Sequence, residues 1–242
     1  MTVRSPREPF PATGAATDAP RLPPIDAPPS LAEAAADLIR DEILAGRLRQ
    51  GDHLVEAKIA EQLRVSRGPV REAFKLLRAE GLLEEEPRRG TFVVSLQAAD
   101  VEEIYGLRAA IEGRAARLVA TARDPAALSE LRRLYEEMER AAGAGDVAAV
   151  YANDLAFHEG LCRLSGNGRL HEVFVRYVPM LRALLRVDEQ VSESPSAIAT
   201  EHEPLLQAIE RGDVDRSVSL AEQHCDRAAG LISTYLQTLG GR

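Results

Sequence analysis

The sequence predicts a mainly α-helical protein, with a small N-terminal domain that contains one β-hairpin and a larger all-α antiparallel helical bundle. Three observations support this fold class. Apolar residues recur at helical spacing from residue 31 almost to the C-terminus. Aromatic residues make up only 4% of the chain and Trp is absent, as in many helix-rich proteins. One stretch alone, residues 82–95, has the pattern of two paired strands.

Residues 1–30 are predicted to be a disordered, proline-rich tail. They contain eight of the 14 prolines, interleaved with Ala, Thr and Ser. A segment of this composition buries too little apolar surface to become ordered. Arg4 and Arg7 are not followed by an apolar stretch, which argues against a secretory signal.

Residues 31–95 are predicted to form a winged helix-turn-helix. Ser30 and Ser66 are favourable N-cap residues for the first and third helices, which end near Gly46 and Gly81. Two strands flank the turn sequence Pro87-Arg88-Arg89-Gly90. The order helix, helix, turn, helix, hairpin is that of a winged helix-turn-helix. The helices are expected at 30–46, 56–63 and 67–79, and the strands at 82–85 and 91–95.

Residues 96–242 are predicted to form the all-helical domain. No convincing strand pattern follows Ala99, and the helical patterns are separated by short breaks rich in Pro, Gly and Ser. Six or seven helices with short connections indicate an antiparallel bundle. The helical patterns cover residues 100–122, 125–142, 146–165, 168–187, 196–211 and 213–239.

Composition excludes several classes of protein. The chain is 45% apolar and 28% charged, with a mean hydropathy of −0.19. No stretch approaches the roughly 18 consecutive apolar residues of a membrane span, so no membrane association is expected. Two cysteines, Cys162 and Cys225, exclude a disulfide scaffold and suit a reducing compartment. A cytoplasmic protein is therefore predicted.

The positive charge is concentrated on the predicted third helix. The net charge of −8 argues against nucleic acid only as an average, because residues 64–78 carry five basic residues and one acid. Arg67, Arg71, Lys75 and Arg78 fall within an arc of about 80°, beside an apolar face. An ordinary solvated face is the alternative interpretation. The preceding short helix and the basic hairpin favour a helix that enters the DNA major groove.

Four of the five histidines lie in the helical half. Asp154 and His158 are four residues apart and share a helix face, and His202 and His224 lie on later helices. Three imidazoles and one carboxylate suit a divalent ion such as Zn, Ni, Mn or Fe. An Asp–His pair at this spacing often occurs by chance, and a lone histidine is usually a surface or core residue. Spacing alone therefore leaves both interpretations open.

The remaining histidines and both cysteines are interpreted as structural. His53 and His171 have no matching partners and are expected at the surface or in packing positions. Cys162 shares the face of Asp154, where packing as a small apolar residue is favoured over metal ligation. Cys225 adjoins His224 in sequence but points about 100° away from it.

Residues 65–93, VSRGPVREAFKLLRAEGLLEEEPRRGTFV, resemble the DNA-binding domain of GntR-type bacterial transcription regulators. The resemblance covers residues 31–95, and the Ser-Arg-x-Pro-Val-Arg-Glu run at 66–72 is highly specific for that family. It implies that Ser66 contacts a phosphate of an operator and that Arg67 and Arg71 reach guanine edges or phosphates.

The resemblance also implies contacts from the hairpin and from the second helix. Arg88, Arg89 and Gly90 at the wing tip would enter the neighbouring minor groove. Some members carry Arg at the start of the second helix, where this chain has Ala57 with Lys58 beside it. We therefore count Lys58 with Lys75 among the DNA-contacting residues.

The C-terminal half resembles the FCD ligand-binding domain of the FadR subfamily within the GntR regulators, over residues 100–235. The motifs are Asp154-Leu155-Ala156-Phe157-His158, Ser165-Gly166-Asn167, Glu201-His202 and His224. The resemblance implies that Asp154, His158, His202 and His224 bind one divalent metal ion and that an effector carboxylate completes its coordination.

Two further residues are candidates for effector binding. In the family an Arg corresponding to Arg108, in Leu107–Glu112, points towards the effector, and a guanidinium matches a carboxylate bidentately. An ion pair of Arg108 with Glu112 at the surface is the alternative. Asn167 is either an effector ligand or a cap at a helix end.

We therefore expect a cytoplasmic, homodimeric transcription regulator that is not an enzyme. It would bind a pseudo-palindromic DNA operator and respond to a small carboxylate effector at the metal, and the resemblance favours repression relieved by the effector. A helical-bundle metalloenzyme is the alternative. Against it, the sequence contains neither a phosphate-binding glycine loop nor a nucleophile motif.

Overall fold

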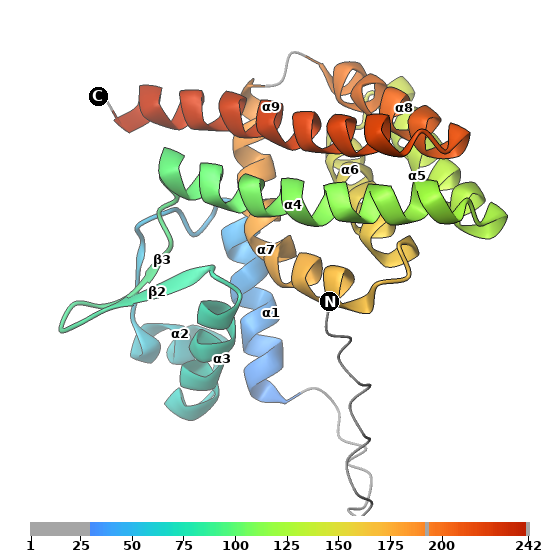
Figure 1. Cartoon of the computed structure of the whole chain (residues 1–242). Helices are drawn as coiled ribbons and strands as arrows, with labels where there is room; N and C mark the ends of the chain where they lie inside the picture. Colours follow the sequence, from blue (N-terminus) through green and yellow to red (C-terminus); the bar gives the residue numbers. More distant parts are fainter. Residues whose placement is uncertain (1–29, 192–193, 241–242) are drawn as a thin grey trace, which may run out of the picture.

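The computed structural model describes residues 30–191 and 194–240, so the predicted tail over residues 1–29 and part of the break near residue 192 lie outside the described residues. A winged helix-turn-helix is followed by a helical bundle (Figure 1). The N-terminal elements are α1 (Leu31–Leu44), β1 (His53–Leu54), α2 (Glu56–Leu63), α3 (Arg67–Ala79), β2 (Leu83–Glu86) and β3 (Gly90–Val93). The bundle comprises α4 (Ala98–Ala122), α5 (Pro125–Ala144), α6 (Val147–Leu164), α7 (Gly168–Val191), α8 (Pro195–Arg211) and α9 (Val214–Gly240).

The predicted mainly helical fold is confirmed, with one added strand. β1 is only two residues long and pairs antiparallel with β3, with His53 opposite Phe92. The sheet order is therefore β1-β3-β2. Two residues are too few to show the alternation on which a strand prediction depends, so no pattern in the sequence indicated β1.

The ends of α1 and α3 show how the local sequence fixes the helices. Ser30 caps α1 as predicted: its hydroxyl accepts a hydrogen bond from the Glu33 amide, and the Glu33 carboxylate accepts one from the Ser30 amide. Ser66 occupies the N-cap position of α3, but its hydroxyl makes no capping hydrogen bond. The predicted N-cap position is confirmed, with the extended backbone that an N-cap requires, and only the side-chain hydrogen bond is not formed.

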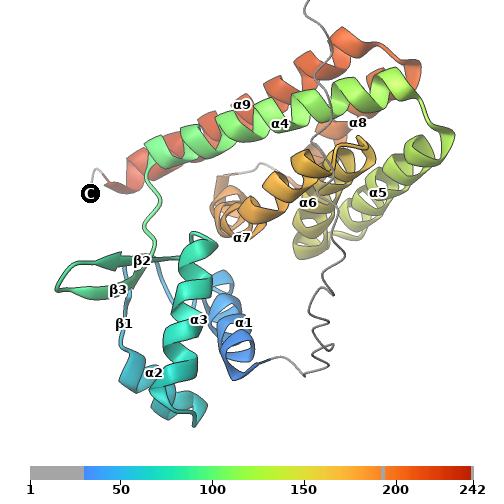
Figure 2. The same ribbon diagram turned by 60° about the horizontal axis from the view of Figure 1, so that its bottom comes forward.

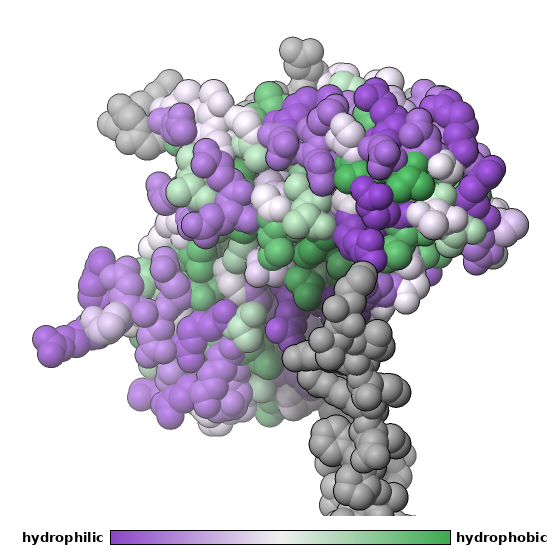
Figure 3. All heavy atoms as spheres, in the orientation of Figure 1, coloured by the Kyte–Doolittle hydropathy of each residue, from purple (hydrophilic) through white to green (hydrophobic). Residues whose placement is uncertain are grey.

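The winged part has its own buried core. Val70, Ala73, Phe74 and Leu77 of α3 are fully buried and form one cluster with residues of α1, the sheet and α2. The opposite face of α3 is exposed, as the basic stripe predicted. In the space-filling view, hydrophilic side chains cover this part of the molecule and the projecting wing (Figure 3).

The bundle is built around the long pair α4 and α9, which lie side by side (Figure 2). The other helices pack beneath this pair, and α5 runs against α6 and α8. Large side chains such as Phe157, Phe174 and Leu206 fill the interior. None of the described helices is long and apolar enough to cross a membrane.

Helix α7 connects the two cores. It packs within the bundle through Phe174 and Leu181, and Ala183 packs against the core of the winged part. The Met180 side chain lies over Gly81, the residue just beyond α3, and Gly81 has a positive φ of 74°. Helix α7 is therefore in direct contact with the residue that follows the basic helix α3, so a movement of α7 would be felt there.

Candidate metal centre and nucleic-acid interface

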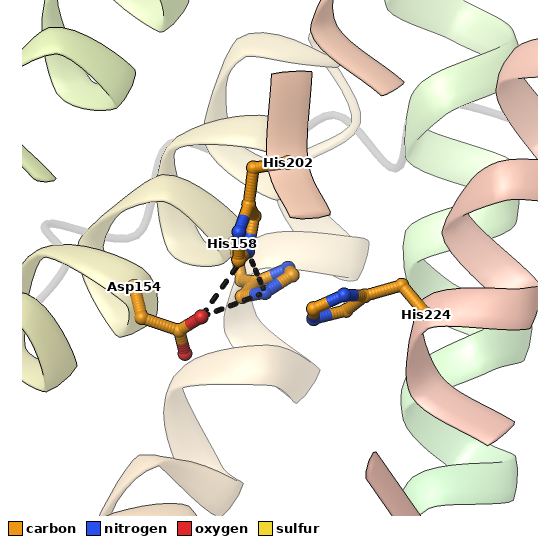
Figure 4. Close-up of side chains that lie close together, drawn as sticks. All are labelled: Asp154, His158, His202 and His224. Atoms are coloured by element: carbon orange, nitrogen blue, oxygen red, sulfur yellow. Dashed lines mark hydrogen bonds and ion pairs between the residues drawn. The ribbon is translucent and has the colours of Figure 1, made fainter. Parts of the chain in front are cut away.

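Four buried side chains from three helices converge in the bundle. Asp154 and His158 lie one turn apart on α6, His202 lies on α8 and His224 on α9 (Figure 4). One ligand atom from each can be chosen so that all four atoms lie within 4.8 Å of one another. The packing of the helices thus brings His202 and His224, which are 44 and 66 positions further along the chain, next to His158.

The spacing of these atoms suits a single ion. His158 Nε2 and His202 Nε2 are 3.0 Å apart, and Asp154 Oδ1 lies 3.1 Å from His202 Nε2 and 3.6 Å from His158 Nε2. Ligand atoms bound at about 2.0–2.2 Å to one ion lie roughly 3–3.5 Å from each other. Little rearrangement is needed for these three groups to share a metal ion.

The outer ring nitrogens of two histidines lie beside oxygen atoms: His202 Nδ1 in a hydrogen bond and His158 Nδ1 in an ion-pair contact. His202 Nδ1 lies 2.8 Å from the Ile198 carbonyl, which only accepts, so Nδ1 carries a proton, and in the neutral ring the Nε2 lone pair then faces the cluster. His158 Nδ1 lies 2.6 Å from Glu112 Oε2. Such partners orient ligating histidines in metal sites.

His224 is held less firmly. Its Nδ1 has no hydrogen-bond partner among the described residues, and Glu201 Oε2 is 3.9 Å away, engaged with Arg227 at 2.8 Å. Glu201 is the acceptor within reach if His224 moves towards an ion. Burial, reinforced by the neighbouring histidines, lowers the pKa of His224 well below its usual value, so the ring is neutral and able to ligate.

The carboxylate of the cluster is held ionised. Burial by itself raises the pKa of Asp154, but the charge and hydrogen bonds of His158 and His202 outweigh burial and hold the pKa well below its usual value. Burial by itself lowers the pKa of His158, but its acidic neighbours Glu112 and Asp154 outweigh burial and raise that pKa. A divalent cation requires an ionised carboxylate and ring nitrogens without protons, so metal binding at this cluster would release protons from the histidines.

Arg108 is buried beside the cluster and pairs with Glu112. Its Nε donates to Glu112 Oε1 at 2.6 Å, and the guanidinium lies over the Tyr105 ring at 4.9 Å. The alternative of an ion pair with Glu112 is therefore correct as to partner, but Arg108 is only 4% exposed and the pair is not at the surface. Arg108 Nη2 is buried and has no hydrogen-bond partner among the described residues.

Asn167 lies at the start of α7 and is engaged as a helix cap. Its Oδ1 accepts a hydrogen bond from the Arg169 amide. The side chain lines an open surface depression with Arg114 and Arg169. Of the two interpretations that the sequence left open for Asn167, these contacts match the cap.

The basic face of α3 is exposed and contains both paired and unpaired cations. Arg71 pairs with Glu56 at the start of α2, and Lys75 pairs with Glu72 on α3 itself. Arg67 is exposed and has no ion pair with any described residue, and the same holds for Lys58 on α2. Arg78 is turned away to Glu85 of β2, at 2.9 Å.

The wing tip is shaped by backbone that favours glycine. Gly90 has a φ of 115°, and a Cβ there would lie 2.5 Å from His53 Nε2. Arg88 has a φ of 66° and an exposed side chain. Arg89 forms an ion pair with Glu86 and stacks 5.3 Å from the Phe92 ring centre. The wing therefore presents two exposed arginines beyond the sheet.

Comparison with known proteins identifies the family. The description "Bacterial regulatory proteins, gntR family" matches residues 31–93, and "FCD domain" matches residues 103–227. A protein of Paenarthrobacter nicotinovorans, named for repression of a D-xylose utilization operon, is 34% identical over 81% of this chain and 85% of its own length. The chain belongs to the GntR family of bacterial regulators.

Other relatives of this GntR regulator agree in fold and in naming. The gluconate operon transcriptional repressor of Bacillus subtilis is 28% identical over 78% of this chain and 79% of its own. The crystal structure of a GntR transcriptional regulator from Rhodococcus sp. RHA1 has 26% identity and a TM-score of 0.68, covering 83% of this chain and 96% of that one. The FCD domain fits the FadR subfamily, and the members found are transcription regulators.

Sequence reasoning about this GntR regulator missed the role of Glu112. It was considered only as a surface partner of Arg108, yet it is fully buried and lies between Arg108 and His158. The available signal was an acid within an apolar helix face, beside Ile111 and Ala115. Charged residues are almost never fully buried unless they are paired.

The side chains interpreted as structural lie where packing explains them. Cys162 and Cys225 are fully buried, and burial raises the pKa of both thiols. His53 stacks on Phe92 with ring centres 4.8 Å apart. His171 lies 3.1 Å from Glu159.

Proposed function

We propose that this GntR regulator binds one divalent metal ion through Asp154, His158, His202 and His224, and that a small carboxylate effector bound there controls its affinity for DNA. The observation that carries the proposal is the convergence of four buried ligand atoms. A buried cluster of this composition is poorly explained by packing, because imidazoles stacked together bury polar atoms that hydrogen bonds only partly satisfy. The bound ion, Zn, Ni, Mn or Fe, supplies a Lewis-acidic charge that attracts a carboxylate.

The effector class follows from the charges beside the cluster. Arg108 donates to Glu112 through Nε and has a buried Nη2 without a partner. A carboxylate that reaches both the ion and this nitrogen would satisfy the free donor. Relatives named for D-xylose and gluconate operons fit a sugar or sugar-acid signal, and gluconate itself carries the carboxylate that this site needs.

The DNA contacts of this proposal come from α3, α2 and the wing. Arg67 and Arg71 contact bases or phosphates in the major groove, Ser66 contributes its uncapped hydroxyl, and Lys58 and Lys75 add phosphate contacts. Arg88, Arg89 and Gly90 enter the minor groove. In a homodimer, two copies of α3 read a pseudo-palindromic operator in the cytoplasm, and effector binding relieves repression.

Coupling between the two sites runs through α7. An effector changes DNA affinity only if it binds two arrangements of the molecule unequally. Met180 lies over Gly81 beyond α3, and Ala183 packs on the winged core. A shift of α7 within the bundle would therefore move the basic helix.

The first experiment is selection of genomic fragments by the purified protein, at moderate salt, with and without added divalent metal. Enrichment of one short palindrome is expected, and gluconate and related carboxylates should then release it only when metal is bound. A selection that enriches no sequence in either condition contradicts the operator, and effector release that does not depend on metal contradicts the role of the ion.

Replacing Arg71 with alanine should weaken binding to the selected operator by about 10-fold or more, because a good bidentate base contact is worth roughly 1–3 kcal/mol. Metal content should stay the same, since Arg71 lies outside the bundle. Fluorescence anisotropy titrations and elemental analysis of the same preparations measure both quantities. Operator affinity equal to that of the wild type would refute the role of Arg71.

A further inference from the structure

One cation on the basic face is held differently from the others. Arg71 Nε and Nη2 donate to Glu56 Oε1 and Oε2 at 3.3 and 3.2 Å, so the guanidinium and the carboxylate lie edge to edge. The two residues are 15 positions apart and belong to different helices, α3 and α2. Arg71 is 60% exposed and Glu56 34% exposed at the side chain.

Arg78 also reaches another element, Glu85 of β2, but through an ion pair of Nη1 alone, and the remaining pairs on this surface are local. Lys75 pairs with Glu72, and Arg89 with Glu86, in each case three residues away. Local surface pairs are easily exchanged for water and contribute little. A bidentate pair between two helices whose backbones are fixed by the same core favours one orientation of both side chains.

The geometry leaves a defined edge of Arg71 free. A guanidinium has five N–H groups, and the carboxylate engages the side that carries Nε and one hydrogen of Nη2. The end with Nη1 and the second hydrogen of Nη2 remains available. Two parallel donors at this end match the O6 and N7 acceptors of guanine in the major groove.

The sequence leaves open whether Arg71 contacts a guanine edge or a phosphate, and the charge of its pair with Glu56 distinguishes these two roles. With Glu56 beside it, Arg71 presents little net positive charge to a phosphate, and the carboxylate repels the DNA backbone. Arg67 has no such partner among the described residues and carries its full charge. The pair therefore favours base reading for Arg71 and leaves phosphate neutralisation to unpaired cations.

We propose that Glu56 is a positioning residue for DNA recognition: it holds Arg71 with its free end directed at a guanine and determines specificity at that base pair. The inference rests on the proposed insertion of α3 into the major groove. It predicts one G·C pair in each half-site at which discrimination depends on a residue that touches no base.

The test uses the full-length protein and the operator selected by the wild type. Affinities are measured for that operator and for versions with each base pair of the half-site replaced in turn, with wild type, Glu56→Gln, Glu56→Ala and Arg71→Ala. Glu72→Gln is the matched control, because it removes one negative charge from a local pair on the same surface. Thermal unfolding of each variant verifies that the winged part is folded.

Glu56→Gln and Glu56→Ala should lose about fivefold or more in discrimination at the same G·C pair where Arg71→Ala loses it, and keep discrimination elsewhere. The freed Arg71 should also steepen the dependence of binding on salt by about one phosphate contact. Glu72→Gln should strengthen binding to all sequences alike.

Two results would overturn the inference while leaving operator binding intact. One is Glu56 variants that discriminate as the wild type does and gain affinity uniformly, as Glu72→Gln does. The other is Arg71→Ala weakening binding equally at every sequence, which would make Arg71 a phosphate contact. If the wild type shows no preference at any base pair, both the proposed sequence-specific operator binding and the role of Glu56 are contradicted.

Discussion

Replacing His202 with alanine is expected to abolish retention of the divalent metal ion. His202 Nε2 lies 3.0 Å from His158 Nε2 and 3.1 Å from Asp154 Oδ1, so it is central to the proposed ligand set. The loss should exceed the 10–100-fold that removal of an outer-shell partner typically costs. Elemental analysis after dialysis against a weak chelator measures occupancy, and thermal unfolding with and without added metal should show no stabilisation of the variant.

His171→Ala is the matched control for this experiment. His171 belongs to the same bundle but is partly exposed, pairs with Glu159 and is not one of the four converging ligands. This variant should keep wild-type metal content. Both variants should bind operator DNA in the absence of metal, because the basic helix and the wing belong to the winged helix-turn-helix and not to the bundle. Full metal occupancy in His202→Ala would disprove the ligand assignment.

The helices of this protein could be predicted from local sequence because their signals are local. The bounds of α2 and α3 agree with the prediction at both ends. For α3, the period of the apolar residues and Gly81 mark the helix within a few residues. The predicted hairpin also forms, although its strands are shifted by a residue or two. β1 was missed because its pairing with β3 is long-range and it is too short to carry a pattern.

The candidate metal centre illustrates the opposite case. Asp154 and His158 share a helix face, which spacing alone can show, but nothing local places His202 and His224 beside them. Their convergence depends on how α8 and α9 pack against α6, and only the family resemblance anticipated it. The contacts of Glu112 with His158 and of Glu56 with Arg71 are likewise invisible to spacing, because each joins residues of two helices.

Replacing Glu112 with alanine should destabilise the fold by about 3–5 kcal/mol, the typical consequence of leaving one member of a buried ion pair without its partner. Arg108 is 4% exposed and Glu112 fully buried, so the guanidinium would be left in the interior without its partner. Chemical denaturation of the metal-free protein measures the change in the free energy of unfolding. Metal affinity should also fall by about 10–100-fold, because His158 Nδ1 loses its acceptor.

Glu137→Ala provides a control of the same spacing and orientation at the surface. Arg133 and Glu137 are also an Arg–Glu pair four residues apart, but their side chains are 50% and 34% exposed, and Arg133 keeps Glu130 as a second partner. Its loss should change stability by less than about 1 kcal/mol.

Joint replacement of Arg108 and Glu112 by methionine distinguishes two causes of the lost stability: a buried charge left unpaired, and the volume lost on truncation to alanine. It removes both charges and should recover most of the stability that Glu112→Ala loses, since an apolar pair of similar volume is often as stable as a buried ion pair. It should not recover metal affinity or the response to a carboxylate. An equal loss of stability in Glu112→Ala and Glu137→Ala would show that the buried pair is hydrated, and would remove the free Nη2 of Arg108 as an effector contact.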